Sequence, residues 1–387
     1  MFDFCTSEEA LSVWFSRLKA LESVLSTGEQ RKTLGRVLEA LPRDLEMICG
    51  LDFLFADSGY KDVVQNTEAH IEFLRQCHVV QNAPSLPAFA LAACCYFKIE
   101  RPDLVSPILT ASILAETPHD HAYHSNQHFR EVLINLIRLL GVHNHIYSET
   151  AQALNEEQIA LLLIAVCIHD LGHDGLGNTV KGVFEQGRLE RRSFKMAEPY
   201  LRKAGLVEQV DLDKVLCMVL STDASPLGDP ASPVSQMKAA YRFHLLGENK
   251  RFSALNLSGD LAWLERDAKV ALMACLLHEA DVATSAGLSY DVTVYQTALF
   301  RHEIGASDAR PEHVLDFLER ICQRGFLSNA GQQLFGPNVA RVYALSEQAM
   351  RQGNEPFPAP EHTDFILSFG RGDSSSAGRS DGKDLLN

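Results

Sequence analysis

The sequence predicts an all-α fold. Apolar residues recur at three- and four-residue spacing in segment after segment, while alternating apolar and polar runs, which are typical of strands, are scarce. Hydrophobic residues make up 46% of the 387 residues, enough for a substantial core, and no internal repeat is found. We therefore expect a compact bundle of many helices around one core, with any chemical site in a central pocket.

Residues 1–60 are predicted to form a helical extension or lid. Ser7, followed by acidic residues, resembles a helix start. Two amphipathic stripes follow, and the second is predicted to end before Pro42. The stripes consist of Leu11, Trp14, Phe15, Leu18 and Leu21, and of Leu34, Val37, Leu38 and Leu41.

Residues 61–352 are predicted to form the main, catalytic domain. Its helices are expected at Ile71–Leu74, Ala88–Tyr96, Phe129–Leu140, Gln158–Cys167, Val183–Ala204, Val210–Leu220, Leu261–Ala283, Val292–Arg301, Val314–Gln323 and Val339–Met350. Residues 353–387 form a tail rich in Pro, Gly and Ser that cannot bury enough apolar surface to order itself. We expect Phe369–Asn387 to be disordered.

Charge and cysteine content narrow the class of function. The net charge of −15 argues against nucleic acid and anionic membranes as partners, because both attract basic surfaces. The nine cysteines include no Cys-x-x-Cys pair, so reduced cysteines in a cytoplasmic protein are expected. The N-terminus lacks a signal-peptide pattern, and no apolar run reaches the roughly 18–20 residues of a membrane span. The sequence does not decide between a monomer and a homodimer.

A His-Asp pair, His169-Asp170, closes a strongly apolar run from Ile159 to Ile168. Buried charges are costly unless they are paired or bind a metal. Three other segments carry residues that could complete such a site. His124 and His128 are spaced to share a helix face, as are His169 and His173, and acidic residues follow or interrupt apolar helices at Asp223 and Asp281. Each feature alone has an ordinary structural explanation, such as a solvated helix face or a buried salt bridge, but their combination favours a metal site.

The order His, His-Asp, Asp resembles the ligand order of the HD-domain metal phosphohydrolases. Imidazole and carboxylate ligands hold Zn, Mn, Fe or Mg, and a metal-bound water can ionise at a pKa of about 7, against about 15.7 in bulk water. Several motifs further resemble the class I cyclic nucleotide phosphodiesterases, in that family's order over roughly 200 residues. They are Tyr123-His124-x-x-x-His128, His169-Asp170-x-x-His173-x-Gly175-x-x-Asn178, Leu189-Glu190, Thr222-Asp223, Ala280-Asp281 and Gln323-x-Gly325-Phe326.

This resemblance implies hydrolysis of a 3′,5′-cyclic nucleotide, cAMP or cGMP, to the 5′-monophosphate by a hydroxide that bridges two divalent ions. It implies that His128, His169, Asp170 and Asp281 hold the tighter ion, usually Zn, and that Asp170 bridges to Mg or Mn. It further implies that His124 is the general acid. The other implied roles are ordering of metal-bound waters by His173, Glu190 and Thr222, and substrate binding by Tyr123, Gln323 and Phe326. A glutamine amide can pair with a purine edge, and we expect Phe326 to present its ring from the same helical face.

The sequence departs from the family pattern at several positions. Ser125 replaces the Asn that follows the catalytic His, Asp174 replaces a Pro, and Arg191-Arg192 replace a pair of histidines. Thr284 stands where an Asn commonly reads adenine, so the preference between cAMP and cGMP does not follow. Two alternatives stay open. One is an HD-type hydrolase of another nucleotide or phosphoester, which would not need Gln323 and Phe326; the other is a nucleotide-binding regulator without catalysis.

Overall fold

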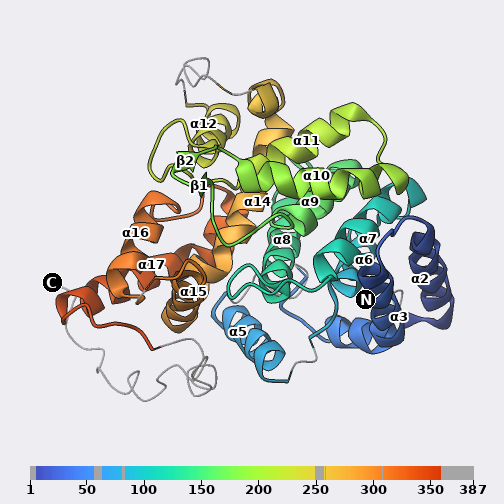
Figure 1. Cartoon of the computed structure of the whole chain (residues 1–387), viewed down its shortest axis with the longest axis horizontal. Coiled ribbons are helices and arrows are strands. Elements are labelled where there is room, and N and C mark those ends of the chain that lie inside the picture. Colours follow the sequence, from blue (N-terminus) through green and yellow to red (C-terminus); the bar gives the residue numbers. More distant parts are fainter. Residues whose placement is uncertain are drawn as a thin grey trace.

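The computed structural model describes residues 6–55, 63–80, 83–248, 257, 259–306 and 308–358. Over these residues the chain is a compact assembly of helices, which confirms the predicted all-α class (Figure 1). The described strands are two residues each: β1 (Thr179–Val180) pairs antiparallel with β2 (Val183–Phe184). The predicted disordered segment, Phe369–Asn387, lies outside the described residues.

The helices follow in chain order. The N-terminal part contains α2 (Glu8–Ala20), the 3₁₀ helix η1 (Leu21–Ser23), α3 (Gly28–Cys49), α5 (Val63–Val80), α6 (Leu86–Tyr96) and α7 (Pro102–Glu116). The middle contains α8 (Asn126–Ile146), α9 (Glu156–Ile168), α10 (Arg188–Lys203), α11 (Gln209–Leu220) and α12 (Pro233–Leu246). The C-terminal part contains η3 (Gly259–Leu261), α13 (Trp263–Arg266), α14 (Ala268–Gly287), α15 (Tyr290–Glu303), α16 (Pro311–Arg320) and α17 (Asn329–Arg351).

Helix α14 is the centre of the core. It packs against α8, α9, α11, α12, α15 and α17, so that nearly every side chain from Val270 to Gly287 is buried. A helix that is apolar on all sides is stable only when it is surrounded, and α14 meets this condition. The same holds for α9, where every residue from Ile159 to Ile168 is buried. Polar side chains on these helices, or at their ends, are therefore held in a rigid apolar frame.

The N-terminal helices extend the same core. Helix α3 does not end before Pro42, as the sequence suggested, but continues to Cys49. Its buried stripe runs on through Leu45 and Ile48, and α3 packs against α6 and α7. This packing offsets the hydrogen bond that a proline inside a helix removes. The division of the chain at residues 60 and 352 stays a prediction.

Two predicted helix boundaries are wrong, each for a local reason. Helix α10 begins at Arg188 rather than Val183, because β2 and a left-handed Gly187 (φ 67°) precede it. A side chain at Gly187 would also collide with Leu220, 2.5 Å from the added Cβ. The predicted helix Leu261–Ala283 is broken at Asp267, whose backbone is extended (φ −134°) and whose carboxylate caps α14 through the amide of Lys269.

Two helices, α7 and α12, were not predicted at all. Both begin with a proline in the first turn, at Pro102 and Pro233, a position where the missing amide hydrogen costs nothing. Among the described helices, none combines the length and the apolar character that crossing a membrane requires. The cytoplasmic location stays a prediction from the sequence, and the choice between a monomer and a homodimer stays open.

Candidate metal centre

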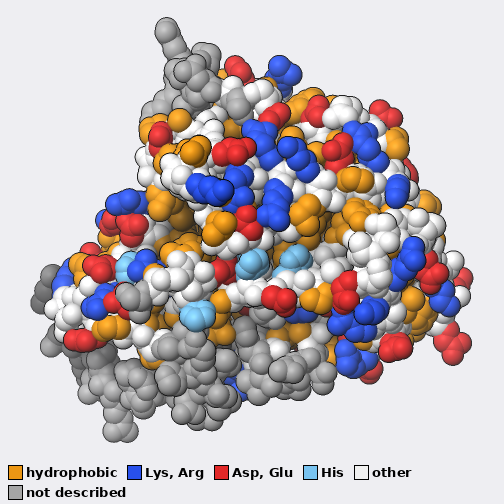
Figure 2. Space-filling view, viewed as in Figure 1, with side chains coloured by type: hydrophobic (Ala, Val, Ile, Leu, Met, Phe, Trp, Pro, Cys, Tyr) orange, Lys and Arg blue, Asp and Glu red, His pale blue; other side chains and the backbone are white. Residues whose placement is uncertain are grey.

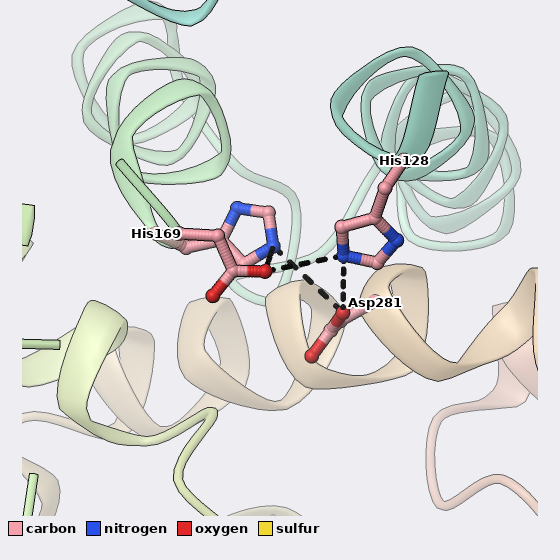
Figure 3. A group of neighbouring side chains, drawn as sticks. His128, His169 and Asp281 are labelled. Carbon is pink, nitrogen blue, oxygen red and sulfur yellow. Dashed lines mark ion pairs between the residues drawn. The ribbon is translucent and has the colours of Figure 1, made fainter. Parts of the chain in front are cut away.

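Four side chains from three separate parts of the chain converge between α8, α9 and α14. One ligand atom each of His128, His169, Asp170 and Asp281 lies within 4.8 Å of the other three. The Nε2 atoms of both histidines are 3.2 Å from Asp170 Oδ2, and they are 3.3 and 3.7 Å from Asp281 Oδ1. Figure 3 shows the side chains of His128, His169 and Asp281 turned toward a common point.

Each of these side chains is placed by the packing of its helix. His128 lies in the first turn of α8, His169 is the C-cap residue of α9 with Asp170 directly after it, and Asp281 lies on α14. Because α14 packs against both α8 and α9, the three positions face one another. Both imidazoles are buried, whereas the two carboxylates keep a little exposure, 14% for Asp170 and 21% for Asp281.

The hydrogen bonding of the imidazoles fits a metal ion. The His169 Nδ1 atom lies 2.8 Å from the carbonyl oxygen of Val166, to which it donates, so Nε2 is the nitrogen that faces the cluster and can bind a metal ion once it has lost its proton. The Nε2 atoms of His128 and His169 are buried, and neither has a hydrogen-bond partner. Orphaned buried nitrogens facing two carboxylates are the arrangement that a divalent cation satisfies.

The electrostatics of the cluster support the same conclusion. Burial alone would lower the pKa of both imidazoles, but the facing carboxylates raise that of His128 to about 9 and that of His169 well above its ordinary value. Burial would raise the pKa of Asp170, yet His169 and His124 hold it well below its usual range. Protons on the imidazoles thus neutralise the carboxylates, and a metal ion would take over that role with release of protons.

His124 lies beside the cluster and is paired with a carboxylate that the sequence analysis missed, Glu303 at the end of α15. The His124 Nδ1 atom is 2.6 Å from Glu303 Oε1, and its Nε2 is 3.9 Å from Asp170 Oδ2. Glu303 Oε2 accepts hydrogen bonds from the amides of Tyr123 and His124 at 2.7 and 3.0 Å. Despite burial, these contacts to His124 and the amides hold the pKa of Glu303 at about 2. Glu303 is therefore an ionised partner that orients the His124 ring.

The predicted helix faces of the histidine pairs are wrong. Helix α8 begins at Asn126, so His124 precedes it and does not share a helical face with His128. Helix α9 ends at Ile168, so His173 lies in the turn that follows rather than one helical turn from His169. Tertiary contacts join them instead: the His173 ring stacks on that of His124, with a centroid distance of 3.4 Å. His173 Nδ1 is also 3.3 Å from Glu303 Oε1.

A pair of buried carboxyls lies on another side of Asp170. Glu190 in the first turn of α10 accepts a hydrogen bond from Asn178 Nδ2 at 3.3 Å. Burial, and then the nearby Asp223 and Asp170, raise the pKa of Glu190 to about 8. Asp223, which is also buried, accepts the amides of Gly187 and Ser225. Burial thus raises the pKa of both carboxyls.

Thr222, in contrast, directs its hydroxyl away from this acidic pair. Its Oγ1 donates to the carbonyl of Val219 at 2.8 Å, within its own chain segment. The lone pairs of the hydroxyl oxygen can still accept a hydrogen bond from a water. The acidic neighbour, Asp223, was noted in the sequence beside Thr222 but received no role there. Asp223 accepts hydrogen bonds from two backbone amides, and its charge helps to raise the pKa of Glu190. It therefore belongs to this acidic pair more directly than Thr222 does.

Asp174 locks the loop that carries Asp170 and His173 onto α10. It accepts two hydrogen bonds from Arg188 at 2.7 and 2.8 Å and one from Arg192 at 2.9 Å. The hydrogen bonds from Arg188 lower the pKa of Asp174 to about 2. Two departures from the family pattern, Asp174 and Arg192, are therefore partners of each other. Gly172 lets the same loop approach α10 closely, because an added Cβ there would lie 2.6 Å from the backbone nitrogen of Ser193.

We expect Asp174→Ala to loosen this loop. The ion pair is partly exposed but bidentate, so its loss should lower the free energy of unfolding by about 1 kcal/mol. It should also weaken metal binding by roughly 10-fold, the lower end for groups that orient ligands. Calorimetric titration of the metal-stripped protein with the metal ion measures the change in metal affinity. Asp213→Ala, at a partly exposed position on α11 where the carboxylate accepts a hydrogen bond from Gln209, is the control and should change neither quantity. Unchanged affinity in Asp174→Ala would contradict the positioning role.

The three residues predicted to bind substrate are placed differently from one another. Tyr123 lies at the cluster, with its ring 4.9 Å from that of His128 and its hydroxyl 3.0 Å from Ser285 Oγ. Gln323 and Phe326 do not share a helical face, as predicted, because α16 ends at Arg320 and Gln323 is left-handed (φ 53°).

Gln323 and Phe326 therefore face different surroundings. Gln323 is exposed, and its amide oxygen accepts a hydrogen bond from Arg242 Nη2 at 2.9 Å. Phe326 is buried against Phe335, with ring centroids 5.4 Å apart. No hydrogen bond, ion pair or ring contact among the described residues joins either of them to the four clustered side chains. Their role as a base pocket stays a prediction.

The face of the molecule shown in Figure 2 exposes histidine side chains near its middle, where α8 and α14 cross in Figure 1. Several Lys and Arg side chains lie directly above them. Asp and Glu side chains lie among them, in keeping with the net charge of −15.

The sequence matches no family model, and no curated protein matches it. Among solved structures, the chain is similar to the phosphodiesterase domain of the RhoPDE fusion protein from the choanoflagellate Salpingoeca rosetta. The two are 16% identical, and the match covers 78% of this chain and 95% of that chain with a TM-score of 0.46. The function proposed below rests on the geometry of the site itself.

Proposed function

We propose that this protein is a metal-dependent phosphohydrolase that opens a 3′,5′-cyclic nucleotide to the 5′-monophosphate. The observation that carries the proposal is the position of the His124–Glu303 pair beside the cluster of His128, His169, Asp170 and Asp281. Metal ligands and a carboxylate-oriented imidazole at one place are the two parts that hydrolysis of a phosphodiester needs.

The four clustered side chains would hold the tighter ion, which we propose to be Zn because two of its ligands are imidazoles. A second ion, Mg or Mn, would be held by the carboxyls of Asp170, Glu190 and Asp223, with His173 and Thr222 ordering its waters. When bound, such ions polarise the phosphoryl group and lower the pKa of a bound water, whose ionised form can attack phosphorus.

The protein's own side chains would supply the proton that the leaving group takes up. Glu303 accepts a hydrogen bond from His124 Nδ1, so Nε2 is the ring nitrogen that faces the cluster. Protonated His124 would donate its Nε2 proton to the departing ribose 3′ oxygen as the phosphorus–oxygen bond breaks. The ionised Glu303 stabilises the ring in its cationic form before this transfer. The ring of Tyr123 lies 4.9 Å from that of His128 and would contact a substrate bound at the cluster.

Product analysis tests the proposal directly. The purified, metal-loaded protein is incubated with cAMP and with cGMP, with and without Mn²⁺ or Mg²⁺, and 5′- and 3′-monophosphates are separated chromatographically. We expect 5′-monophosphate only, and only with metal. Turnover of other phosphoesters but of neither cyclic nucleotide would favour a different HD-type hydrolase. Binding of a cyclic nucleotide without turnover of any phosphoester would favour a regulator.

The base pocket has its own test. If Gln323 pairs with the base, Gln323→Ala should raise KM for the cyclic nucleotide by roughly 10-fold, the loss expected for one hydrogen bond to a neutral group, with little change in kcat. Rotation of its amide away from Arg242 would be required for this pairing. Gln348→Ala, on the C-terminal half of α17, is the control. An unchanged KM would remove Gln323 from the substrate site and favour a hydrolase of another phosphoester.

A further inference from the structure

A second group of potential metal ligands lies next to the cluster. One ligand atom each of His121, His173 and Glu303 lies within 4.8 Å of the other two. They come from the segment before α8, the loop after α9 and the end of α15, so only the tertiary fold brings them together. The side chains of His173 and Glu303 are largely buried, with 10% and 4% of their surface exposed. The proposed phosphodiester mechanism has no use for His121.

The hydrogen bonding of His121 prepares it to bind a metal ion. Its Nε2 lies 3.0 Å from the carbonyl oxygen of His173, and a carbonyl can only accept, so Nε2 carries the hydrogen. In the neutral form of the ring, Nδ1 is then the nitrogen that carries the lone pair. Metal-binding histidines commonly donate their other ring hydrogen to a backbone carbonyl in this way. The bond also ties His121 to the backbone of a second member of the group.

Two imidazoles and one carboxylate favour zinc over magnesium or calcium, which prefer oxygen ligands. In a tetrahedral zinc site with bonds of about 2.1 Å, ligand atoms lie roughly 3.4 Å apart. His173 Nδ1 and Glu303 Oε1 are already at 3.3 Å. Small side-chain movements of His121, together with loss of the 3.3 Å hydrogen bond that His173 Nδ1 accepts from the Gly175 amide, would complete three ligands and leave the fourth position to water.

From this geometry we propose a third cation site, formed by His121, His173 and Glu303, at which Zn²⁺ inhibits the enzyme. The reason for inhibition is a shared atom: Glu303 Oε1, the closest oxygen to His173, also holds His124 Nδ1 at 2.6 Å. A zinc ion on that oxygen would take it from His124 and place a positive charge beside the proton donor. The inhibitory effect rests on the proposed function, whereas the existence of the site does not.

Zinc counting tests the site without any assay of activity. Full-length protein is stripped with a chelator and titrated with Zn²⁺ by calorimetry, and bound zinc is counted after equilibrium dialysis. We expect His121→Ala to bind one zinc fewer than the wild type, or to bind that zinc at least 10-fold more weakly, with the tighter binding unchanged. His145→Ala, an exposed histidine at the opposite end of α8, is the matched control. Equal stoichiometry and affinity in His121→Ala and the wild type would overturn the proposal.

His121→Asn guards against a folding defect, because its side-chain amide can still donate to the His173 carbonyl but is a poor zinc ligand. It should lose the same zinc as His121→Ala and melt at the wild-type temperature. In the activity assay with Mn²⁺, excess Zn²⁺ should inhibit the wild type, and both variants should need at least 10-fold more zinc while keeping the basal rate. Loss of a bound zinc without any change in inhibition would overturn the inhibitory role. If no substrate is turned over, zinc counting still decides whether the site exists.

Discussion

Asp281→Asn is expected to abolish metal-dependent turnover and to weaken metal binding by at least about 100-fold. Asp281 is a carboxylate on the central helix α14 within 3.3 Å of His128 Nε2 and 3.7 Å of His169 Nε2. Its replacement removes an anionic ligand, a larger change than the loss of a group that merely orients one, which costs roughly 10–100-fold. The amide has nearly the same shape, so the packing of α14 should be kept.

Metal content after dialysis, measured together with hydrolysis, checks this expectation. Asp316→Asn is a suitable control, since that carboxylate lies on the surface of α16 and pairs with Arg320 one helical turn away. It should retain the metal and full activity. A variant Asp281→Asn that keeps both its metal content and its activity would remove Asp281 from the ligand set.

Glu303→Gln is expected to lower kcat by roughly 10²–10⁴-fold while the metal content stays unchanged, because general acid catalysis typically contributes that much. A glutamine keeps one oxygen to accept the amides of Tyr123 and His124, but it cannot stabilise a cationic His124 ring as a carboxylate does. His124→Ala should lower kcat by a similar factor, and the double variant should be little worse than either single one, because the two residues act as a unit.

Steady-state kinetics and metal analysis of the three variants separate this role from others. Glu312→Gln, at an exposed position in the first turn of α16, is the control and should behave as the wild type. Loss of metal from His124→Ala would make His124 a ligand rather than a proton donor. A Glu303→Gln variant with unchanged kcat would show that Glu303 only holds the backbone of Tyr123 and His124.

Most of the fold was predictable because helical periodicity is a local property. The stripes in α2 and α3 and the apolar run of α9 are visible in any short window of the sequence. The errors occur where the periodic signal was overridden, by packing in one case and by a local cap in another. Pro42 lies inside α3 because the helix gains buried contacts on both sides of it, and Asp267 interrupts a continuous apolar pattern by capping α14.

The candidate site likewise contains some residues that were predictable from the sequence and others that were not. His128, His169, Asp170 and Asp281 were conspicuous because titratable residues in or beside apolar helices are rare without a partner, and the structure brings all four together. Glu303 had no comparable signal. It ends a helix of ordinary amphipathic character, 179 residues from His124, and only the docking of α15 against the segment before α8 reveals its role.

The sequence alone thus determined the all-α class and nominated the residues that converge at the candidate centre, because helix formation and the cost of buried charge depend on residue type and short-range spacing. Only the tertiary structure decided which groups meet: Glu303 with His124, Asp174 with Arg188 and Arg192, and His121 with His173. Such contacts depend on how helices pack over long separations along the chain, and no local pattern encodes that packing.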